Sequence, residues 1–149
     1  MSMQAKLMDD MKAAMKAGDK LRLETIRGIR SQMKNYEIDK GHPLTEEDEI
    51  QVLLSAAKKR RESIEQFRQV NRLDRAAEEE KELEIIQSYL PKQMSEDEIV
   101  NLVNQVIQEV GATSSRDMGK VMGKIMPQIK GKADGKVVQG IVQQKLASL

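Results

Sequence analysis

The sequence contains no cysteine and no tryptophan, and it has only one histidine, one phenylalanine and two tyrosines among its 149 residues. Without cysteine there is no thiol nucleophile, no disulfide and no thiolate metal site. A single histidine cannot supply a pair of imidazole ligands. We therefore expect no metal and no cofactor. The core must be aliphatic, because the aromatic residues are too few to fill it.

Long apolar runs are also missing. No stretch approaches the roughly 18 residues that a membrane-spanning helix needs, and residues 1–6 lead into no apolar segment of a secretory signal. We therefore expect no membrane partner and a cytoplasmic protein. The 25 basic and 24 acidic residues nearly balance, giving a net charge of +1. Any affinity for nucleic acid must then come from a local basic patch.

Apolar residues recur with the period of a helix almost throughout, and no strand-length alternating run is present. The pattern predicts seven helices whose apolar stripes are buried, with Met15, Met126 and Val137 among the stripe residues. Pro127 is expected to end or kink the sixth helix. Side chains that can accept a backbone N–H predict the helix starts: Asp19, Thr45, Asp74, Ser95, Ser114 or Ser115, and Asp134.

Pro91 marks the clearest boundary in the chain, because a proline disfavours helix in the residue before it. Ser95 and the acidic residues that follow it then open a new helix. The sequence predicts an all-α protein with two helical subdomains. The N-terminal subdomain covers residues 1–92, and a smaller C-terminal bundle covers residues 95–149.

The charge is concentrated near the C-terminus, where residues 116–149 hold seven basic and two acidic residues, a net +5. Arg116, Lys120 and Lys124 are spaced to lie on one helix face, with Gly119 and Gly123 on the same side. Each glycine costs a helix about 0.8–1 kcal/mol relative to alanine. One interpretation is a surface that follows phosphates and lets a ligand approach the backbone. The other is a small-residue groove in which a neighbouring helix packs.

Two further basic segments allow both a functional and a structural interpretation. Residues 131–136 combine two lysines, flexible glycines and a helix N-terminus, which are the parts of an anion site. Asp134 would compete for the same N–H donors as a cap, so an ordinary turn between helices is the alternative. The basic run 58–61 spreads around a helix, and Glu62 and Glu65 can pair with it. We interpret that run as a solvated face.

Residues able to perform catalysis do not form a recognisable set. Ser114 and Ser115 with Lys120 are reminiscent of a serine amidase, but such a site needs a strand–turn scaffold and an oxyanion pocket. A helix N-cap explains both serines. His42 stands between Gly41 and Pro43, where a surface turn is expected. We assign no catalytic residue.

Several motifs are nevertheless distinctive. Residues 117–123 (Asp-Met-Gly-Lys-Val-Met-Gly), Met126-Pro127 and residues 131–136 (Gly-Lys-Ala-Asp-Gly-Lys) resemble the GatB/YqeY family. Residues 90–96 and 23–27 are similar to stand-alone YqeY-like members. The resemblance implies two all-helical subdomains. In the glutamine-dependent aspartyl/glutamyl-tRNA amidotransferase, a similar domain is the tail of the B subunit, which contacts tRNA while the chemistry resides elsewhere.

From this resemblance we expect a tRNA-binding module, accessory to glutamine-dependent tRNA amidation. Its expected partners are tRNA or another folded RNA, and an amidotransferase or aminoacyl-tRNA synthetase complex. A carbon–nitrogen ligase with glutamine as amide donor and a helical protein–protein adaptor are the alternatives. The residues expected to contact RNA phosphates, or to permit their close approach, are Arg116, Gly119, Lys120, Gly123, Lys124, Lys130, Gly131, Lys132, Gly135 and Lys136.

Overall fold

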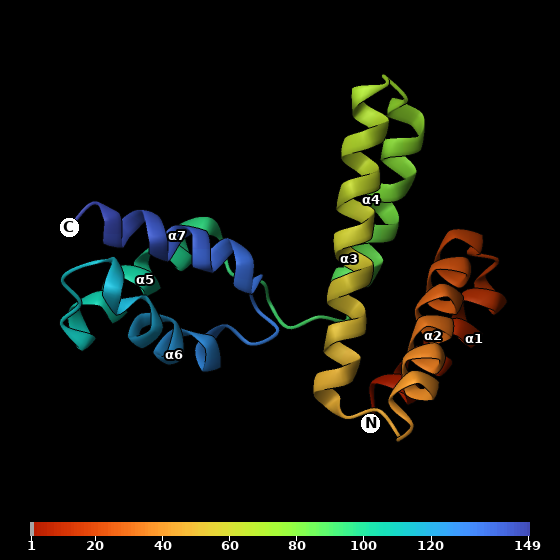
Figure 1. Ribbon diagram of the computed structural model, residues 1–149. Helices are drawn as coiled ribbons and strands as arrows, with labels where there is room; N and C mark the ends of the chain where they lie inside the picture. Colours follow the sequence, from red (N-terminus) through yellow and green to blue (C-terminus); the bar gives the residue numbers. More distant parts are fainter. Residues whose placement is uncertain (1) are drawn as a thin grey trace. The chain divides into compact units, whose positions relative to one another are not determined.

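A computed structural model describes residues 2–149, and every regular element in that range is helical (Figure 1). The expected all-α fold is confirmed. A single 3₁₀ turn, η1 (Ser115–Asp117), precedes the sixth helix. The α-helices are α1 (Met3–Ala17), α2 (Lys20–Lys40), α3 (Glu46–Gln69), α4 (Leu73–Gln87), α5 (Glu96–Val110), α6 (Met118–Ile129) and α7 (Gly135–Ala147).

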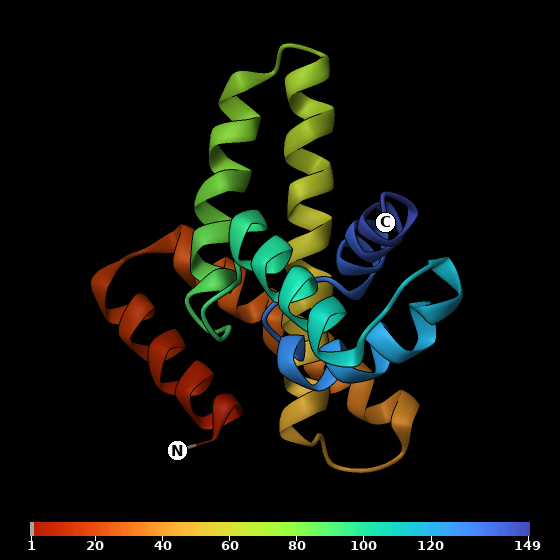
Figure 2. The ribbon, with the colours of Figure 1, turned by 90° about the vertical axis from the view of Figure 1, so that its left-hand side faces the viewer.

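The chain divides into two compact units, of which the first ends at Pro91 and the second is Lys92–Leu149. In the first unit, α1 packs beside α2, and α3 and α4 form a long antiparallel hairpin (Figure 2). The core lies where the base of the hairpin meets α1 and α2. Its most deeply buried side chains include Leu7, Ile26, Met33, Leu53 and Ile86.

The hairpin explains the basic run 58–61. Lys58, Lys59 and Arg61 are exposed, whereas Arg60 turns toward α4. Its Nε lies 3.4 Å from Glu79 and 3.1 Å from Glu82. The run is therefore spread around the helix as expected, although the acidic partners of Arg60 come from α4.

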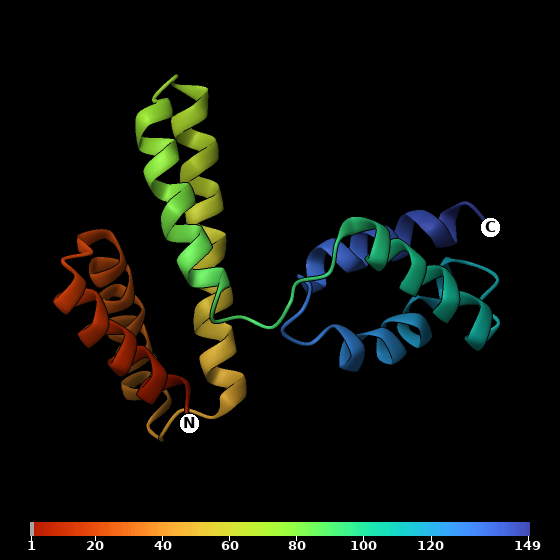
Figure 3. The ribbon, with the colours of Figure 1, turned by 180° about the vertical axis from the view of Figure 1, so that it is seen from behind.

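The second unit is a three-helix bundle of α5, α6 and α7 (Figure 3). Its apolar stripes enclose a separate aliphatic core, and several predicted signals delimit its helices. The Ser95 hydroxyl accepts the N–H of Glu98 at the start of α5, and Gly111 ends that helix with φ +65°. Asp134 accepts the N–H of Lys136 at the start of α7. The core consists of Ile99, Val103, Val106, Ile107, Val121, Ile125, Ile129, Val138, Val142 and Leu146.

Three residues of the predicted apolar stripes are not buried. Met15, Met126 and Val137 are 54%, 47% and 52% exposed. Each lies directly beside a buried residue in the sequence, which on an α-helix places it about 100° around the axis. The apolar face is thus narrower at these points than the sequence pattern implied.

One predicted helix start was also wrong, and of the two outcomes expected at Pro127 the helix end did not occur. Asp74 does not cap α4, which begins at Leu73 after Arg72 without a side-chain cap. The Asp74 carboxylate instead accepts a hydrogen bond from Nε of Arg72. Pro127 does not end α6, because the helix continues to Ile129.

Candidate nucleic-acid interface

The helix α6 has one buried and one open face. Val121, Ile125 and Ile129 are buried, whereas the opposite side carries Gly119, Lys120, Gly123 and Lys124, all exposed. A Cβ built at Gly119 or Gly123 would meet no heavy atom within 4 Å. Within the second unit, therefore, no helix packs against these glycines, and the groove interpretation does not hold inside that unit.

Arg116 does not continue the row of Lys120 and Lys124. It belongs to η1, so α-helical spacing does not apply to it. The adjoining Asp117 carboxylate accepts the N–H groups of Thr113 at 2.8 Å and Ser114 at 3.4 Å. The Thr113 bond, followed by that of Ser114 and the charge of Lys120, holds the pKa of Asp117 below its ordinary value of 3.8. An ionised carboxylate thus lies beside this end of the basic face.

Lys124 has an acidic partner. Its Nζ lies 2.8 Å from a carboxylate oxygen of Glu109 on α5, and both side chains are exposed. This contact is the main reason why the pKa of Glu109 lies below its ordinary value of 4.5. Exposed ion pairs are worth about 0–1 kcal/mol, so an incoming phosphate can replace the carboxylate at little cost.

Lys130 and Lys132 lie in the turn after α6 and Lys136 in the first turn of α7, and all three are exposed. Asp134 Oδ1 accepts the N–H of Lys136 at 2.9 Å, as a capping carboxylate would. This contact favours the interpretation of residues 131–136 as a capped turn, because one of the donors that an anion would need is occupied.

Of the two glycines at this turn and the start of α7, only Gly131 is required by the fold, whereas Gly135 makes an ordinary contact. Gly131 is buried with φ +73°, a conformation that favours glycine. A Cβ at Gly135 would lie 3.7 Å from Cε of Met126. Among the four glycines expected at the interface, only Gly119 and Gly123 present open backbone.

One basic residue near this turn was missed by the sequence analysis. The N–H of Met94 donates to the carbonyl of Lys132 at 2.9 Å, and Nε2 of Gln93 donates to the carbonyl of Gly131 at 2.8 Å. These bonds bring Lys92 beside the turn, where it lines a pocket together with Lys132. No local motif could have revealed this pairing, since the two lysines are far apart in the sequence.

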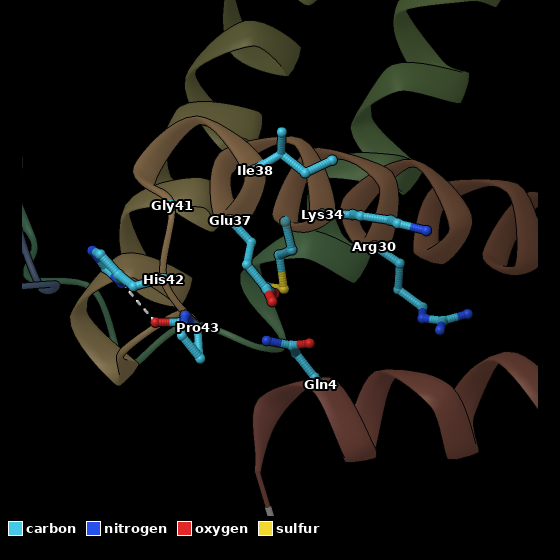
Figure 4. A pocket seen from close by; sticks show the side chains of 9 residues that line it. Gln4, Arg30, Lys34, Glu37, Ile38, Gly41, His42 and Pro43 are labelled. Atoms are coloured by element: carbon cyan, nitrogen blue, oxygen red, sulfur yellow. Dashed lines mark hydrogen bonds between the residues drawn. The ribbon is translucent and has the colours of Figure 1, made fainter.

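A second pocket, with a volume of about 530 Å³, lies in the first unit between α1, α2 and the loop 41–43 (Figure 4). Cationic Arg30 and Lys34 and the carboxylate of Glu37 all line it. His42 is exposed, as expected of a surface turn, and its Nδ1 lies 2.8 Å from the carbonyl oxygen of Pro43. The mixed charges do not select one class of ligand.

Of the two serines considered for catalysis, Ser114 has a structural role. The Ser114 hydroxyl accepts the N–H of Arg116 at 3.3 Å, and Asp117 returns a bond to the N–H of Ser114, forming a capping box. Ser115 is exposed. Within residues 2–149, no three His, Cys, Asp or Glu side chains gather in a way that would hold a metal ion. Over the same residues, no helix is long and apolar enough to cross a membrane.

Comparison with known proteins identifies relatives over most of the chain. The family model described as Yqey-like protein matches residues 4–146. Proteins named "Altered inheritance of mitochondria protein 41, mitochondrial" are similar in three yeasts. The one from Lachancea thermotolerans is 41% identical over 71% of this chain and 58% of its own length. Those from Clavispora lusitaniae and Vanderwaltozyma polyspora are 37% and 32% identical, over 71% and 75% of this chain and 63% and 64% of their own lengths.

The chain thus spans about three fifths of the length of these curated relatives. Their names correct one expectation: the assignment to the cytoplasm was wrong, since the relatives are named as mitochondrial. Composition carries little information about compartment, because targeting is read from short address segments and not from the folded helices. The family model covers nearly all of the chain, and the chain therefore belongs to the YqeY-like family.

Proposed function

We propose that this protein is a tRNA-binding module, accessory to glutamine-dependent tRNA amidation, and that it binds RNA through the open face of α6 and the turn that follows. The observation that supports this most directly is the bare backbone at Gly119 and Gly123, which no other part of the second unit covers. Lys120 and Lys124 flank this backbone and are exposed.

Helical glycines without a packing role are unfavourable. Each costs about 0.8–1 kcal/mol relative to alanine, and neither Gly119 nor Gly123 accommodates a neighbouring side chain. A ligand that approaches the helix backbone closely accounts for them. Lysines at the same face would neutralise phosphates, which supply most of the sequence-independent affinity for nucleic acids.

The distribution of aromatic residues indicates which kind of RNA this surface suits. Tyr36, Phe67 and Tyr89 all lie in the first unit, so the second unit has no aromatic side chain on which bases could stack. Proteins that bind single strands without sequence preference rely on such stacking. Contacts to the shape and backbone of a folded RNA fit this unit better.

A protein adaptor is the second candidate, because an open small-residue face also suits a partner's helix. The ligase alternative gains no support from Ser114, because its hydroxyl is used in a helix cap. Salt dependence separates RNA from a protein helix. Phosphate contacts weaken strongly as salt rises, whereas apolar helix packing does not.

The test is binding of unfractionated tRNA by fluorescence anisotropy at several salt concentrations. If Lys120, Lys124, Lys132 and Lys136 each contact one phosphate, log K against log salt should have a slope of about −3 to −4. The double variant Lys120→Glu/Lys124→Glu should weaken binding at least about tenfold and flatten this slope.

The matched control is Lys58→Glu/Lys59→Glu, which makes the same charge change on exposed residues of α3. It should bind tRNA nearly as well as the unchanged protein. Loss of RNA binding in the control but not in the α6 variant would place the surface in the first unit. Binding that is insensitive to salt would favour the adaptor.

A further inference from the structure

The pocket beside Lys132 lies entirely within the second unit. It has a volume of about 350 Å³, at the lower end of the range for small-molecule sites. Three kinds of chemical group line this pocket: two ammonium groups, apolar side chains and oxygen acceptors. The lining residues are Lys92, Met94, Glu98, Leu102, Gln128 and Lys132.

Backbone hydrogen bonds hold the two lysines on the same pocket. The Met94 N–H bond to the Lys132 carbonyl and the Gln93 bond to the Gly131 carbonyl tie the segment before α5 to the turn after α6. Both lysines are exposed, and within residues 2–149 neither has an acidic partner. Two unpaired ammonium groups held in this way form a site for a phosphate.

Met94 and Leu102 supply the apolar surface of the pocket, and both are half-buried. A methionine thioether makes favourable contacts with aromatic rings. A planar base can therefore lie against these side chains even though the unit has no aromatic residue.

Glu98 and Gln128 determine which base edge fits. The Glu98 carboxylate accepts a bond from the Ser95 hydroxyl at 3.2 Å and has further acceptor capacity. Nε2 of Gln128 already donates to the carbonyl of Lys124 at 3.1 Å, which leaves the amide oxygen for a ligand. Both groups thus favour a base that donates. Guanine presents two adjacent donors, N1–H and the N2 amino group, whereas the N3–H of uracil lies between two carbonyls that a carboxylate repels.

We propose that this pocket binds one unpaired guanine nucleotide of the RNA, with its phosphate between Lys92 and Lys132 and its donor edge toward Glu98. The inference rests on the proposed RNA-binding function and deepens it. The nucleotide must be unpaired, because in a duplex the same base edge is occupied by its partner.

The first test is an NMR titration of the full ¹⁵N-labelled chain with 5′-GMP, 5′-UMP and inorganic phosphate. GMP should shift the amides around Lys92, Glu98 and Lys132 and bind at least about fivefold more tightly than UMP or phosphate. Equal affinity for GMP and UMP, or no shifts at these residues, would overturn the inference.

Variants separate the two halves of the ligand. Lys92→Gln/Lys132→Gln should weaken GMP and UMP alike, because the phosphate contacts are lost. Glu98→Gln should remove the preference for GMP over UMP while keeping the response to phosphate, because the amide retains an acceptor for Ser95. Lys145→Gln, which changes a lysine of α7 outside the pocket, is the control and should leave GMP binding unchanged.

The same samples distinguish this inference from the function on which it rests. If tRNA binds in a salt-dependent way but GMP does not shift the pocket, the inference is wrong and the proposed function stands. If GMP binds with the expected preference but tRNA does not bind, the proposed function fails. The assignment of the nucleotide to RNA is then overturned in favour of a free nucleotide.

Discussion

The ammonium of Lys124 lies 2.8 Å from the carboxylate of Glu109 and joins α6 to α5 at the edge of the open face. Both side chains are exposed, so the pair contributes at most about 1 kcal/mol to stability. Its larger effect is on charge. One of the two lysines beside the bare backbone of Gly119 and Gly123 is partly neutralised in the free protein.

Replacing Glu109 with glutamine should therefore strengthen RNA binding. The substitution removes a negative charge that repels phosphates and frees Lys124 to contact one. We expect tRNA affinity to rise about threefold to tenfold at low salt, with the salt slope steeper by up to about 0.9. Anisotropy titrations measure both. Glu62→Gln, the same change on α3, serves as the control, and an unchanged or lower affinity for Glu109→Gln would contradict the role of Lys124.

The glycines of α6 allow a test in which stability and binding move in opposite directions. A Cβ at Gly119 or Gly123 meets nothing within 4 Å. Alanine at both positions should thus raise the free energy of unfolding by about 1–2 kcal/mol in total, measured by urea denaturation. If an RNA backbone approaches these residues, the same variant should bind tRNA less tightly.

Gly140→Ala provides the matched control for that experiment. Gly140 is an exposed helical glycine of α7 with equally open surroundings. It should stabilise the protein without changing tRNA binding. Should the α6 double alanine bind tRNA as well as the unchanged protein does, close approach to the backbone is not the reason for these glycines.

The serines before α6 should differ in their contributions to stability. Ser114 is the N-cap of η1 and shares a capping box with Asp117, whereas Ser115 is the first residue of the turn. Ser114→Ala should cost about 0.5–2 kcal/mol, and Ser115→Ala much less. Thermal and urea denaturation of the two variants provide the comparison. Equal losses of stability in the two variants would contradict the assignment of Ser114 as the cap.

The pH dependence of stability should involve Glu49, which is only 7% exposed. Burial, followed by the charge of Glu46, raises the pKa of Glu49 above its ordinary value of 4.5, although the N–H of Gln4 opposes this shift. The folded protein thus binds this proton more tightly than the unfolded chain does. The stabilisation of the folded protein by this tighter proton binding is fully present below about pH 4.5. It is lost as the pH rises through the raised pKa of Glu49.

Glu49→Gln should for this reason raise the free energy of unfolding at pH 7 and change it little at pH 4. The amide keeps an oxygen that can accept the Gln4 N–H, so the start of α1 retains its contact. Unfolding midpoints across this pH range measure the effect. A variant that is destabilised equally at both pH values would show that the ionised carboxylate is required for the contact with α1.

The sequence by itself determined the helices of this protein and most of their ends. Helical period is a property of residues three and four apart, and the caps at Thr45, Ser95 and Asp134 act within three residues of their own helix. The same local character explains the errors. Asp74 has the chemistry of a cap, yet the N-cap of α4 is Arg72, two residues earlier.

Only the tertiary structure decided how the residues of the basic segment are arranged. Gly119 and Gly131 each stand beside a lysine in the sequence. Gly131 is buried in a turn, whereas Gly119 has open surroundings. Lys124 is paired because α5 brings Glu109 to it. Lys92 reaches the pocket because the neighbouring Gln93 and Met94 donate hydrogen bonds to the turn after α6. These relationships join residues from different helices. The packing of the aliphatic core determines which helix faces meet, and the local sequence pattern does not encode that packing.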